Sequence, residues 1–460
     1  MAGSAGLGSS LFEIDMTDTR LNRQNIFALG FMTFAFFLGA GNIIFPPLAG
    51  QLAGTEVTLA MLGFLVTAVG LPLLTLIAVA VAGGDMESVT RDLPRAVAVS
   101  ITVAIFIVIG PAFALPRTSL VAYETGMKPL FGESVVPLWL YTIGFFTVAV
   151  ALALHRGSLI DYIGKVLTPI LIVLLAVLGI AVVVEPLAPI GELAAGSAVS
   201  DAAKAYHEAP FSKGFIEGYN TMDTFGALMF GVLIVDVLRK KGVSDRGFQA
   251  SYLIQAGVIA AIGLALVYTS LFYLGATSGT VAAGADNGGE ILALYVQGVF
   301  GQPGQWILSA VVTLACLTTA VGLTGACSDY FANLLGMKYR TLVVVFAAIS
   351  ALVANVGLSY LISVSIPVLI ALYPVAVALV VLNLLRRHLN HPKQAFRWVV
   401  GIAFALALLD AIKAADVPGA TTLVETASHL PLFGYGLAWL VPVTAAVVVA
   451  MAWPKPSVDK

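Results

Sequence analysis

Long apolar runs separated by short polar segments dominate this chain. A helix needs about 17–25 predominantly apolar residues to cross the hydrocarbon core of a bilayer. Twelve segments have roughly this length, at residues 25–52, 57–82, 96–123, 135–154, 159–184, 214–238, 248–276, 304–334, 341–357, 361–385, 396–415 and 434–453. The pattern predicts an all-α integral membrane protein with about twelve transmembrane helices, which are called spans 1 to 12 below.

The composition excludes a soluble domain. Of the 460 residues, 59% are hydrophobic and only 10% are charged. A soluble domain carries about 25% charged residues, because it must cover a water-facing surface. The only cysteines, Cys316 and Cys327, lie in one apolar segment. We therefore expect them to be buried in helix packing rather than joined in a disulfide framework.

The distribution of positive charge predicts the orientation. If both termini are cytoplasmic, all but five of the 23 Lys and Arg residues fall on the cytoplasmic face, the exceptions being Arg117, Lys128, Lys204, Lys213 and Lys413. Cytoplasmic loops of membrane proteins carry such an excess of positive charge. We therefore expect twelve spans with both termini in the cytoplasm.

Span 1 contains the sequence GAGNIIFPP, from Gly39 to Pro47. Lipid offers no partner for freed backbone groups, so a helix break at this depth should line a cavity or be buried in protein. We expect half-helices over residues 25–38 and 44–53, with Pro46 and Pro47 in the first turn of the second one. The alternative is a proline-kinked helix that packs closely through its glycines.

Span 6 contains a second candidate break, GFIEGYNTMDTFGALMFG, in which Asn220, Thr221 and Asp223 interrupt an apolar frame. Interrupted segments in corresponding positions of two halves point to a transporter site built on inverted repeats. The breaks are five spans apart, and an odd number inverts the second half relative to the first. We therefore expect a five-plus-five inverted repeat with discontinuous helices 1 and 6, followed by two extra helices.

This arrangement divides the chain into parts. We expect a cytoplasmic N-terminal segment (1–24), a first inverted repeat (25–184), an extracellular loop (185–213), a second inverted repeat (214–385), and spans 11–12 with the C-terminal tail (386–460).

Within each break, carbonyls at the end of one half-helix face a cation and amides at the start of the next face an anion. An amino-acid zwitterion carries both charges.

Three motifs in chain order resemble the bacterial branched-chain amino acid:cation symporter family. They are GAGNIIFPP in span 1, GPAFALPRTS (Gly110–Ser119) in span 3 and EGYNTMDTFGALMFG (Glu217–Gly231) in span 6. With the span count and the length, the resemblance covers nearly the whole chain. It implies sodium-coupled uptake of leucine, isoleucine and valine across the bacterial inner (cell) membrane. The family is also similar in architecture to the sodium-coupled leucine-transporter fold.

The expected function is therefore secondary active import of branched-chain amino acids by sodium symport, with alternating access around a mid-membrane site. The sequence contains no Walker motif, nucleophile–base pair or metal-ligand cluster, so an enzyme is not expected. A channel would favour a continuous polar pore, whereas the polar residues cluster at two breaks. The alternative is a proton-coupled symporter, or one for a different neutral amino acid, with the same fold. Expected partners are the amino acid, sodium as the coupling ion and the lipid bilayer, with no organic cofactor, no nucleic acid and no obligatory protein partner.

The breaks supply the candidate substrate-binding residues, which are Gly39, Ala40, Gly41, Asn42, Tyr219 and Asp223. A carboxylate at mid-depth is costly and therefore points to function. Asp223 can bind the substrate ammonium, bind a cation or carry a proton; the alternative is a structural acid that accepts from freed amides of its own break. Asn42 offers an amide oxygen that can cap the second half-helix or bind a cation.

The resemblance to the leucine-transporter fold implies one sodium site. In that fold, an alanine and two following hydroxyl residues of helix 8 bind sodium together with carbonyls at the first break. The corresponding residues here are Ala35 and Leu38 in span 1, and Ala315, Thr318 and Thr319 in span 8. A hard cation prefers such oxygen ligands.

Two further sets of charged residues lie within spans. Arg117 in span 3 should pair with an acid or with freed carbonyls, because an isolated cation is expensive there. We interpret Arg117 as a gate or brace, since the branched aliphatic side chain of the substrate needs no charged partner. Glu217 lies nearer the outer edge of span 6. Asp410 and Lys413 in span 11 are spaced i,i+3 and are expected to pair locally.

Overall fold

Helices form all of the regular structure in the residues that the computed structural model describes, which are 20–132, 135–154, 168–184, 186–192 and 200–454. Six of these helices are long and apolar enough to cross a membrane, and two more form a seventh span bent by 41°. Four shorter apolar helices complete the set in the described part of the chain. All twelve predicted spans coincide with helical structure, and only residues 159–167 of span 5 lie outside the described residues.

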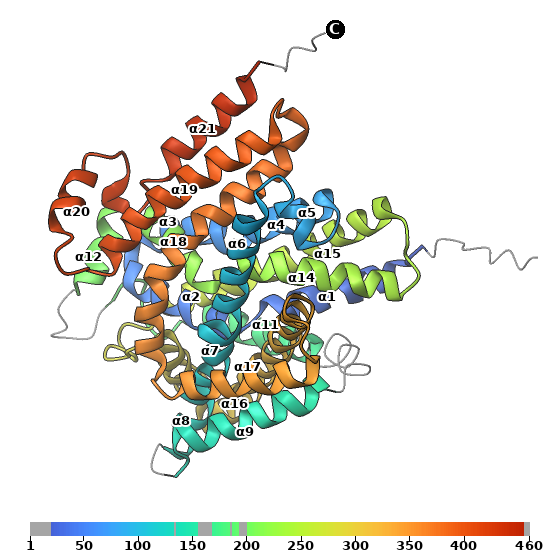
Figure 1. The fold of residues 1–460 in the computed structure, drawn as a ribbon. Coiled ribbons are helices and arrows are strands. Elements are labelled where there is room, and N and C mark those ends of the chain that lie inside the picture. Colours follow the sequence, from blue (N-terminus) through green and yellow to red (C-terminus); the bar gives the residue numbers. More distant parts are fainter. Residues whose placement is uncertain (1–19, 133–134, 155–167, 185, 193–199, 455–460) are drawn as a thin grey trace, which may run out of the picture.

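In the described part of the chain, ten α-helices lie within or between the first five spans (Figure 1). They are α1 (Arg23–Phe37), α2 (Ala40–Ala53), α3 (Val57–Leu65), α4 (Leu71–Ala82), α5 (Met86–Thr90), α6 (Arg95–Ile107), α7 (Ala114–Ala122), α8 (Lys128–Phe131), α9 (Leu138–Leu154) and α11 (Thr168–Val184). Single π-helical turns join α3 to α4, α6 to α7 and α7 to α8. Such turns widen a helix locally and are frequent at functional sites.

The rest of the described chain continues in the same way. Its helices are α12 (Asp201–Glu208), α13 (Pro210–Glu217), α14 (Asp223–Lys240), α15 (Arg246–Ala276), α16 (Gly288–Leu335), α17 (Tyr339–Ala354), α18 (Leu358–Leu385), α19 (Pro392–Ala414), α20 (Thr421–Ala427) and α21 (Leu440–Ala452). Spans 1–10 share one hydrophobic core, whereas α18, α19 and α21 build a second one beside it. Spans 11 and 12 are therefore additions to the ten-span unit (Figure 1).

Span 1 breaks earlier and more sharply than expected. Helix α1 ends at Phe37 and α2 begins at Ala40, so only Leu38 and Gly39 leave the helix. The expectation that Pro46 and Pro47 start the second half-helix is wrong, since both lie inside α2. Each proline removes the donor for the carbonyl four residues earlier, and both sit too deep in α2 to mark its start.

Span 6 breaks at Met222. Helix α13 ends at Glu217, a 3-10 turn covers Gly218–Thr221, and α14 begins at Asp223. Met222 itself adopts φ 61°, a left-handed conformation that is uncommon for a residue other than glycine. The discontinuous helices 1 and 6 are thus confirmed, five spans apart.

The two breaks touch each other at Gly41. A Cβ atom added to Gly41 would lie 3.2 Å from the carbonyl oxygen of Asn220 and 3.2 Å from the Cα atom of Thr221. Such distances are tighter than in nine of ten ordinary Cβ contacts. Glycine at this position therefore allows the backbones of spans 1 and 6 to meet.

Other glycines bring neighbouring helices even closer together. A Cβ on Gly50 of α2 would lie 2.1 Å from the Phe272 carbonyl oxygen of α15, and one on Gly275 would lie 2.0 Å from the Pro47 oxygen. Helices α3 and α13 meet in the same manner, where a Cβ on Gly214 would lie 1.8 Å from the Ala60 oxygen. Small residues permit this close packing between membrane helices.

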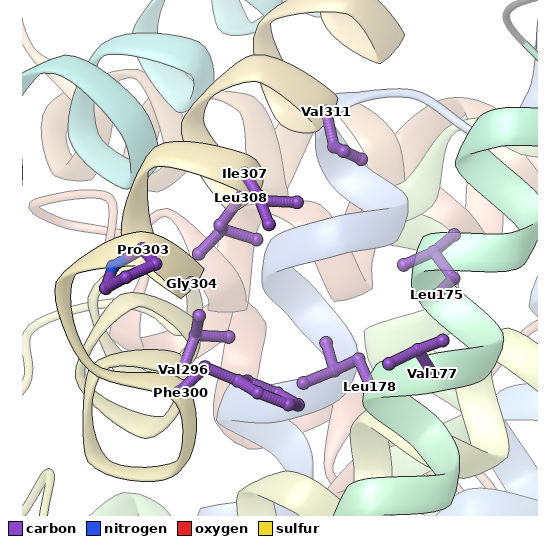
Figure 2. A pocket seen from close by; sticks show the side chains of 10 residues that line it. All are labelled: Leu175, Val177, Leu178, Val296, Phe300, Pro303, Gly304, Ile307, Leu308 and Val311. Atoms are coloured by element: carbon purple, nitrogen blue, oxygen red, sulfur yellow. The ribbon is translucent and has the colours of Figure 1, made fainter.

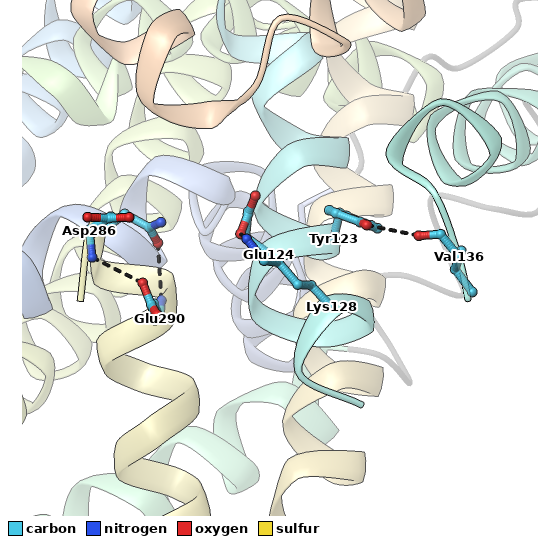
Figure 3. Close-up of polar contacts among 7 residues, drawn as sticks. Tyr123, Glu124, Lys128, Val136, Asp286 and Glu290 are labelled. Atoms are coloured by element: carbon cyan, nitrogen blue, oxygen red, sulfur yellow. Dashed lines mark hydrogen bonds and ion pairs between the residues drawn. The ribbon is translucent and has the colours of Figure 1, made fainter. Parts of the chain in front are cut away.

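The start of α16 covers α2 and the end of span 3. A Cβ on Gly288 would lie 1.7 Å from the Ile44 carbonyl oxygen, so this turn rests directly on α2. Figure 3 shows the polar contacts here: Asp286 N donates to Glu290 Oε2 at 3.0 Å, and Glu124 and Lys128 form an ion pair at 3.1 Å. Helix α16 then kinks at Gly301, where φ is 63°, before it enters the core.

Candidate functional site

A small cavity lies between the two breaks. Its lining comes from spans 1, 3, 6 and 8 and consists of Phe36, Phe37, Gly39, Ala40, Gly41, Asn42, Ile109, Ala114, Arg117, Thr118, Thr221, Met222, Asp223, Gly226, Phe230, Thr319 and Leu323. The volume is about 40 Å³. Ligand pockets usually measure about 300–1,000 Å³, so this cavity is smaller than a typical ligand pocket.

Asp223 and Asn42 join the two breaks at the cavity wall. The Asn42 side-chain amide donates to Asp223 Oδ2 at 2.7 Å and also to the hydroxyl of Tyr268 in α15. Tyr268 in turn donates to Asp223 Oδ2 at 2.8 Å. All three side chains are buried. Spans 1, 6 and 7 therefore share one polar cluster in an otherwise apolar core.

The carboxylate of Asp223 contacts side chains of other spans, not freed amides of its own break. Asn42 and Tyr268 both donate to Oδ2, and the side chain of Thr221 in the same break also lies against the carboxylate. A carboxylate has acceptor capacity for further hydrogen bonds, so a ligand can still bind it. A substrate ammonium group or a cation in the cavity would supply the missing positive charge.

The start of α2 offers donors to the same cavity. Asn42 caps this helix through its oxygen Oδ1, which accepts from Gly39 N at 3.2 Å. The amides of Ala40, Gly41 and Asn42 belong to the first turn, where no intrahelical acceptor exists. The positive end of the helix dipole adds to their attraction for an anion. This end of the cavity can therefore bind a carboxylate.

Arg117 also reaches the cavity and is only 2% exposed. Its Nη1 donates to the Asn220 carbonyl oxygen at 2.7 Å, and its Nη2 donates to Ser365 Oγ at 3.0 Å. Its guanidinium lies 5.1 Å above the centre of the Phe45 ring. Arg117 thus contacts a freed carbonyl, as expected, and it connects spans 1, 3, 6 and 10.

Of the five expected sodium ligands, one lines the cavity at the breaks. Thr319 lines the cavity beside Gly39, and its buried hydroxyl has no hydrogen-bond partner among the described residues. Thr318 Oγ1 donates to the Ala315 carbonyl oxygen at 2.8 Å. Ala35 and Leu38 are buried at the end of α1, outside the cavity lining. In the described part of the chain, no cluster of three or more His, Cys, Asp or Glu side chains is placed to hold a metal.

Tyr219 does not line the cavity. Its ring stacks on Tyr373 with centroids 4.2 Å apart, and it is buried. Glu217 accepts from Asn220 Nδ2 at 3.1 Å and supports the 3-10 turn. The structure therefore separates these residues from the five other candidate substrate residues, all of which reach the cavity.

Tyr268 and the aromatic part of the cavity wall were not predicted from the sequence. Phe36, Phe37 and Phe230 supply this wall, and Phe36 stacks on Phe230 with centroids 5.2 Å apart. A signal for Tyr268 exists, because it is a polar-tipped residue buried in an apolar helix. The sequence alone does not distinguish it from Tyr273 in the same helix.

The pair expected in span 11 is absent. Lys413 donates to the carbonyl oxygens of Phe433 and Gly434, both at 3.1 Å. Asp410 Oδ2 accepts from the amide of Ala438 at 3.0 Å. Freed backbone groups of the loop before α21 compete with the local ion pair, and hydrogen bonds to charged groups are strong. The two expected buried cysteines are, by contrast, both buried and free.

A second, larger cavity lies between α11 and α16 (Figure 2). Its volume is about 230 Å³, and side chains such as Leu175, Phe300 and Ile307 line it. Every lining residue is apolar or a glycine. It has no group that would bind a carboxylate or an ammonium, unlike the cavity at the breaks.

Comparisons with known proteins identify the family to which this chain is similar. The sequence profile of the family described as "Branched-chain amino acid transport protein" matches residues 22–456. The branched-chain amino acid transport system 2 carrier protein of Pseudomonas aeruginosa is 47% identical over 94% of this chain and 97% of its own. The branched-chain amino acid permease BrnQ of Salmonella typhimurium is 42% identical over 95% of this chain and 97% of its own.

A solved structure resembles the fold as well. The nucleobase-cation-symport-1 family transporter MHP1, in a closed conformation with bromovinylhydantoin bound, superposes with a TM-score of 0.56. The match covers 93% of this chain and 91% of that one, at 16% sequence identity. At this identity the likeness concerns the fold alone, and it agrees with the all-α architecture.

Proposed function

Because this chain belongs to the family of branched-chain amino acid transport proteins, we propose that it imports leucine, isoleucine and valine into a bacterial cell by secondary active transport. The family consists of multi-span membrane transporters, so the expectation of a transporter rather than an enzyme is confirmed. The proposal concerns the substrates, the coupling ion and the direction of movement.

One observation carries the proposal: a single cavity has a carboxylate, free helix amides and an apolar wall. Asp223 faces the ammonium group of the substrate, and the amides of Ala40, Gly41 and Asn42 face its carboxylate. The wall formed by Ile109, Leu323 and the phenylalanines receives the aliphatic side chain. All three parts of a branched-chain amino acid thereby find a matching surface.

We propose sodium as the coupling ion. The unpartnered, buried hydroxyl of Thr319 supports a cation site beside the first break, together with Thr318 and the carbonyls of Ala35, Leu38 and Ala315. These neutral oxygens do not release protons at physiological pH, which favours a metal cation. The alternative is proton coupling through Asp223, the buried carboxylate of the same cavity.

The expected orientation and repeats complete the proposal. With both termini in the cytoplasm, the first repeat covers residues 25–184 and the second covers 214–385, and the loop at 185–213 lies outside the cell. Alternating access then exposes the cavity at the breaks to each side of the membrane in turn.

Counterflow in proteoliposomes tests the proposal. Purified protein is reconstituted with internal unlabelled leucine, and the uptake of labelled amino acids is followed with and without external sodium. We expect accumulation of leucine, isoleucine and valine that depends on sodium. Absence of counterflow for all three amino acids would refute the substrate assignment, and uptake that follows an imposed pH gradient without sodium would refute the coupling ion.

A further inference from the structure

Arg117 carries a buried positive charge that no acid neutralises by contact within the described part of the chain. Its described contacts are the Asn220 carbonyl oxygen, the Ser365 hydroxyl and the Phe45 ring, all of them neutral. No carboxylate of a described residue lies within ion-pair distance of it. Glu217, in the turn before the break, accepts from Asn220 instead.

Part of the guanidinium group is left without an acceptor. Arginine has five N–H donors. One from Nη1 and one from Nη2 are engaged, whereas Nε is buried and has no hydrogen-bond partner in the described structure. Nε–H lies on one edge of the plane together with an Nη N–H, and a carboxylate engages such an edge through two parallel hydrogen bonds. The donor set therefore fits an incoming carboxylate.

The place of this side chain fits the same ligand. Arg117 lines the cavity into which the first turn of α2 presents Ala40 and Gly41, and Asp223 lines it as well. A buried ion is strongly unfavourable until a counter-charge and further hydrogen bonds reach it. The arriving anion would thus meet both an unpaired cation and free helix amides.

We propose that Arg117 binds the α-carboxylate of the transported amino acid, while Asp223 binds the ammonium group of the same molecule. This inference rests on the proposed function and adds a substrate contact to the interpretation of Arg117 as a gate or brace. The cavity then binds both charged groups of the zwitterion, and the apolar wall between Arg117 and Asp223 contacts the side chain. Since Arg117 also holds the Asn220 carbonyl, the carboxylate is bound where the break of span 6 is fixed.

A purely structural role makes a different prediction. A brace between spans 3, 6 and 10 would support the fold equally for every ligand. Its removal would weaken the binding of all ligands by a similar factor. A carboxylate-binding residue changes only the preference for ligands that carry this group.

The experiment measures that preference directly. Labelled leucine is bound to the purified protein, and unlabelled leucine and leucinol compete for the site. Leucinol keeps the ammonium group and the side chain but lacks the carboxylate. The readout is the ratio of the inhibition constant of leucinol to that of leucine. Since a hydrogen bond to a charged group contributes substantially, we expect a ratio of roughly tenfold to a hundredfold or more in the unmodified protein.

The variants separate charge from bracing. Arg117→Gln should lower the ratio roughly tenfold or more, mainly through weaker leucine binding. Arg117→Lys keeps the charge without the planar fork and should give an intermediate ratio. Ser365→Ala removes a bracing contact and should leave the ratio unchanged. Arg340→Gln, at an exposed position, serves as the matched arginine control.

Several results would overturn the inference. One is an unaltered ratio in Arg117→Gln, and another is an equal loss of leucine and leucinol binding. If Arg117→Gln does not fold, the ratio measured for Arg117→Lys tests the inference instead, and an unaltered ratio there refutes it. Equally tight binding of leucinol and leucine by the unmodified protein refutes the inference without any variant. If the unmodified protein binds none of leucine, isoleucine and valine, the proposed function fails instead, so the two failures are distinguishable.

Discussion

The side-chain amide of Asn42 donates a hydrogen bond of 2.7 Å to the carboxylate of Asp223, a residue 181 positions later in the chain. The contact connects the break in span 1 with the break in span 6. It fixes the relative position of the two half-helices that enclose the cavity. Changes at either residue should therefore alter binding more than they alter the assembly of the remaining core.

Asp223→Asn should weaken leucine binding by roughly tenfold to a hundredfold, because the substrate ammonium loses a charge-assisted partner. Asparagine keeps the shape and can still accept from Asn42, so the protein should remain folded. Binding of labelled leucine to purified protein measures the change. Asp236→Asn, in a half-exposed ion pair with Arg239, is the control and should bind leucine normally. Normal binding by Asp223→Asn would remove this residue from the site.

Tyr268→Phe should reduce leucine affinity by a few-fold. The change removes the donor to Asp223 Oδ2 but keeps the ring, which packs edge-on against Phe64 with centroids 5.3 Å apart. A net loss of ~0.5–1.5 kcal/mol is usual for one hydrogen bond. Leucine titrations measure the affinity, and Tyr360→Phe at an exposed site is the control. An affinity equal to that of the unmodified protein would show that the polar cluster tolerates loss of this hydroxyl.

Gly41→Leu should abolish leucine transport while insertion into the membrane continues. Even a Cβ atom would approach the Asn220 oxygen and the Thr221 Cα to 3.2 Å, so a larger side chain must force the breaks apart. Gly41→Ala should retain part of the activity. Gly144→Leu is the matched control, since a Cβ there meets no atom within 4 Å. Uptake and membrane content are measured together, and full uptake by Gly41→Leu would mean that the breaks need not touch.

Thr319→Ala should shift the sodium dependence of leucine uptake to higher concentrations by a few-fold, as expected for loss of a contact contributing ~0.5–1.5 kcal/mol. Its hydroxyl has no partner in the described structure, so the thermal unfolding midpoint should barely change. Thr318→Ala should also weaken sodium binding, and Thr319→Ser should behave like the unmodified protein. Because substrate and cation affinities are linked, saturating sodium should restore leucine affinity. Unaltered sodium dependence in both alanine variants would move the cation site elsewhere.

Leucine, isoleucine and valine should compete with one another for uptake, whereas lysine and glutamate should not inhibit. In an apolar pocket, one methylene changes the binding free energy by only ~1–3 kcal/mol, so discrimination among the three amino acids should be modest. A charged side chain would lose its hydration against Ile109, Phe230 and Leu323. Competition against labelled leucine in proteoliposomes measures this, and strong inhibition by lysine or glutamate would contradict the apolar wall.

The sequence predicted the spans and both breaks because these depend on local properties. Apolar length determines a membrane helix, and residues such as Gly39 and Asp223 mark where it is interrupted. The preference of proline for a first helical turn led to a wrong position for the start of the second half-helix. Pro46 and Pro47 lie inside α2 instead. Helix boundaries follow from packing between spans as well as from residue preference.

The contacts within the site could not be predicted from the sequence, because they join residues that are far apart along the chain. Nothing in the chain around Tyr268 indicates that its hydroxyl meets Asn42 and Asp223. Arg117 was expected to find an acid or freed carbonyls, and only the fold shows that its described partners are neutral. Likewise, Lys413 binds loop carbonyls rather than Asp410, since the loop before α21 happens to return to this point.

The glycine contacts limit how the protein can move. Gly50 and Gly275 interlock the backbones of α2 and α15, and Gly214 interlocks α13 with α3. At these glycines the two backbones touch without an intervening side chain, so a shift of one helix along its partner would bring main-chain atoms into collision. We therefore expect the two helices of each pair to move together, with the start of α16 held against α2 at Gly288. A displacement that opens the cavity is then expected at the interruptions of the helices, Leu38 and Met222.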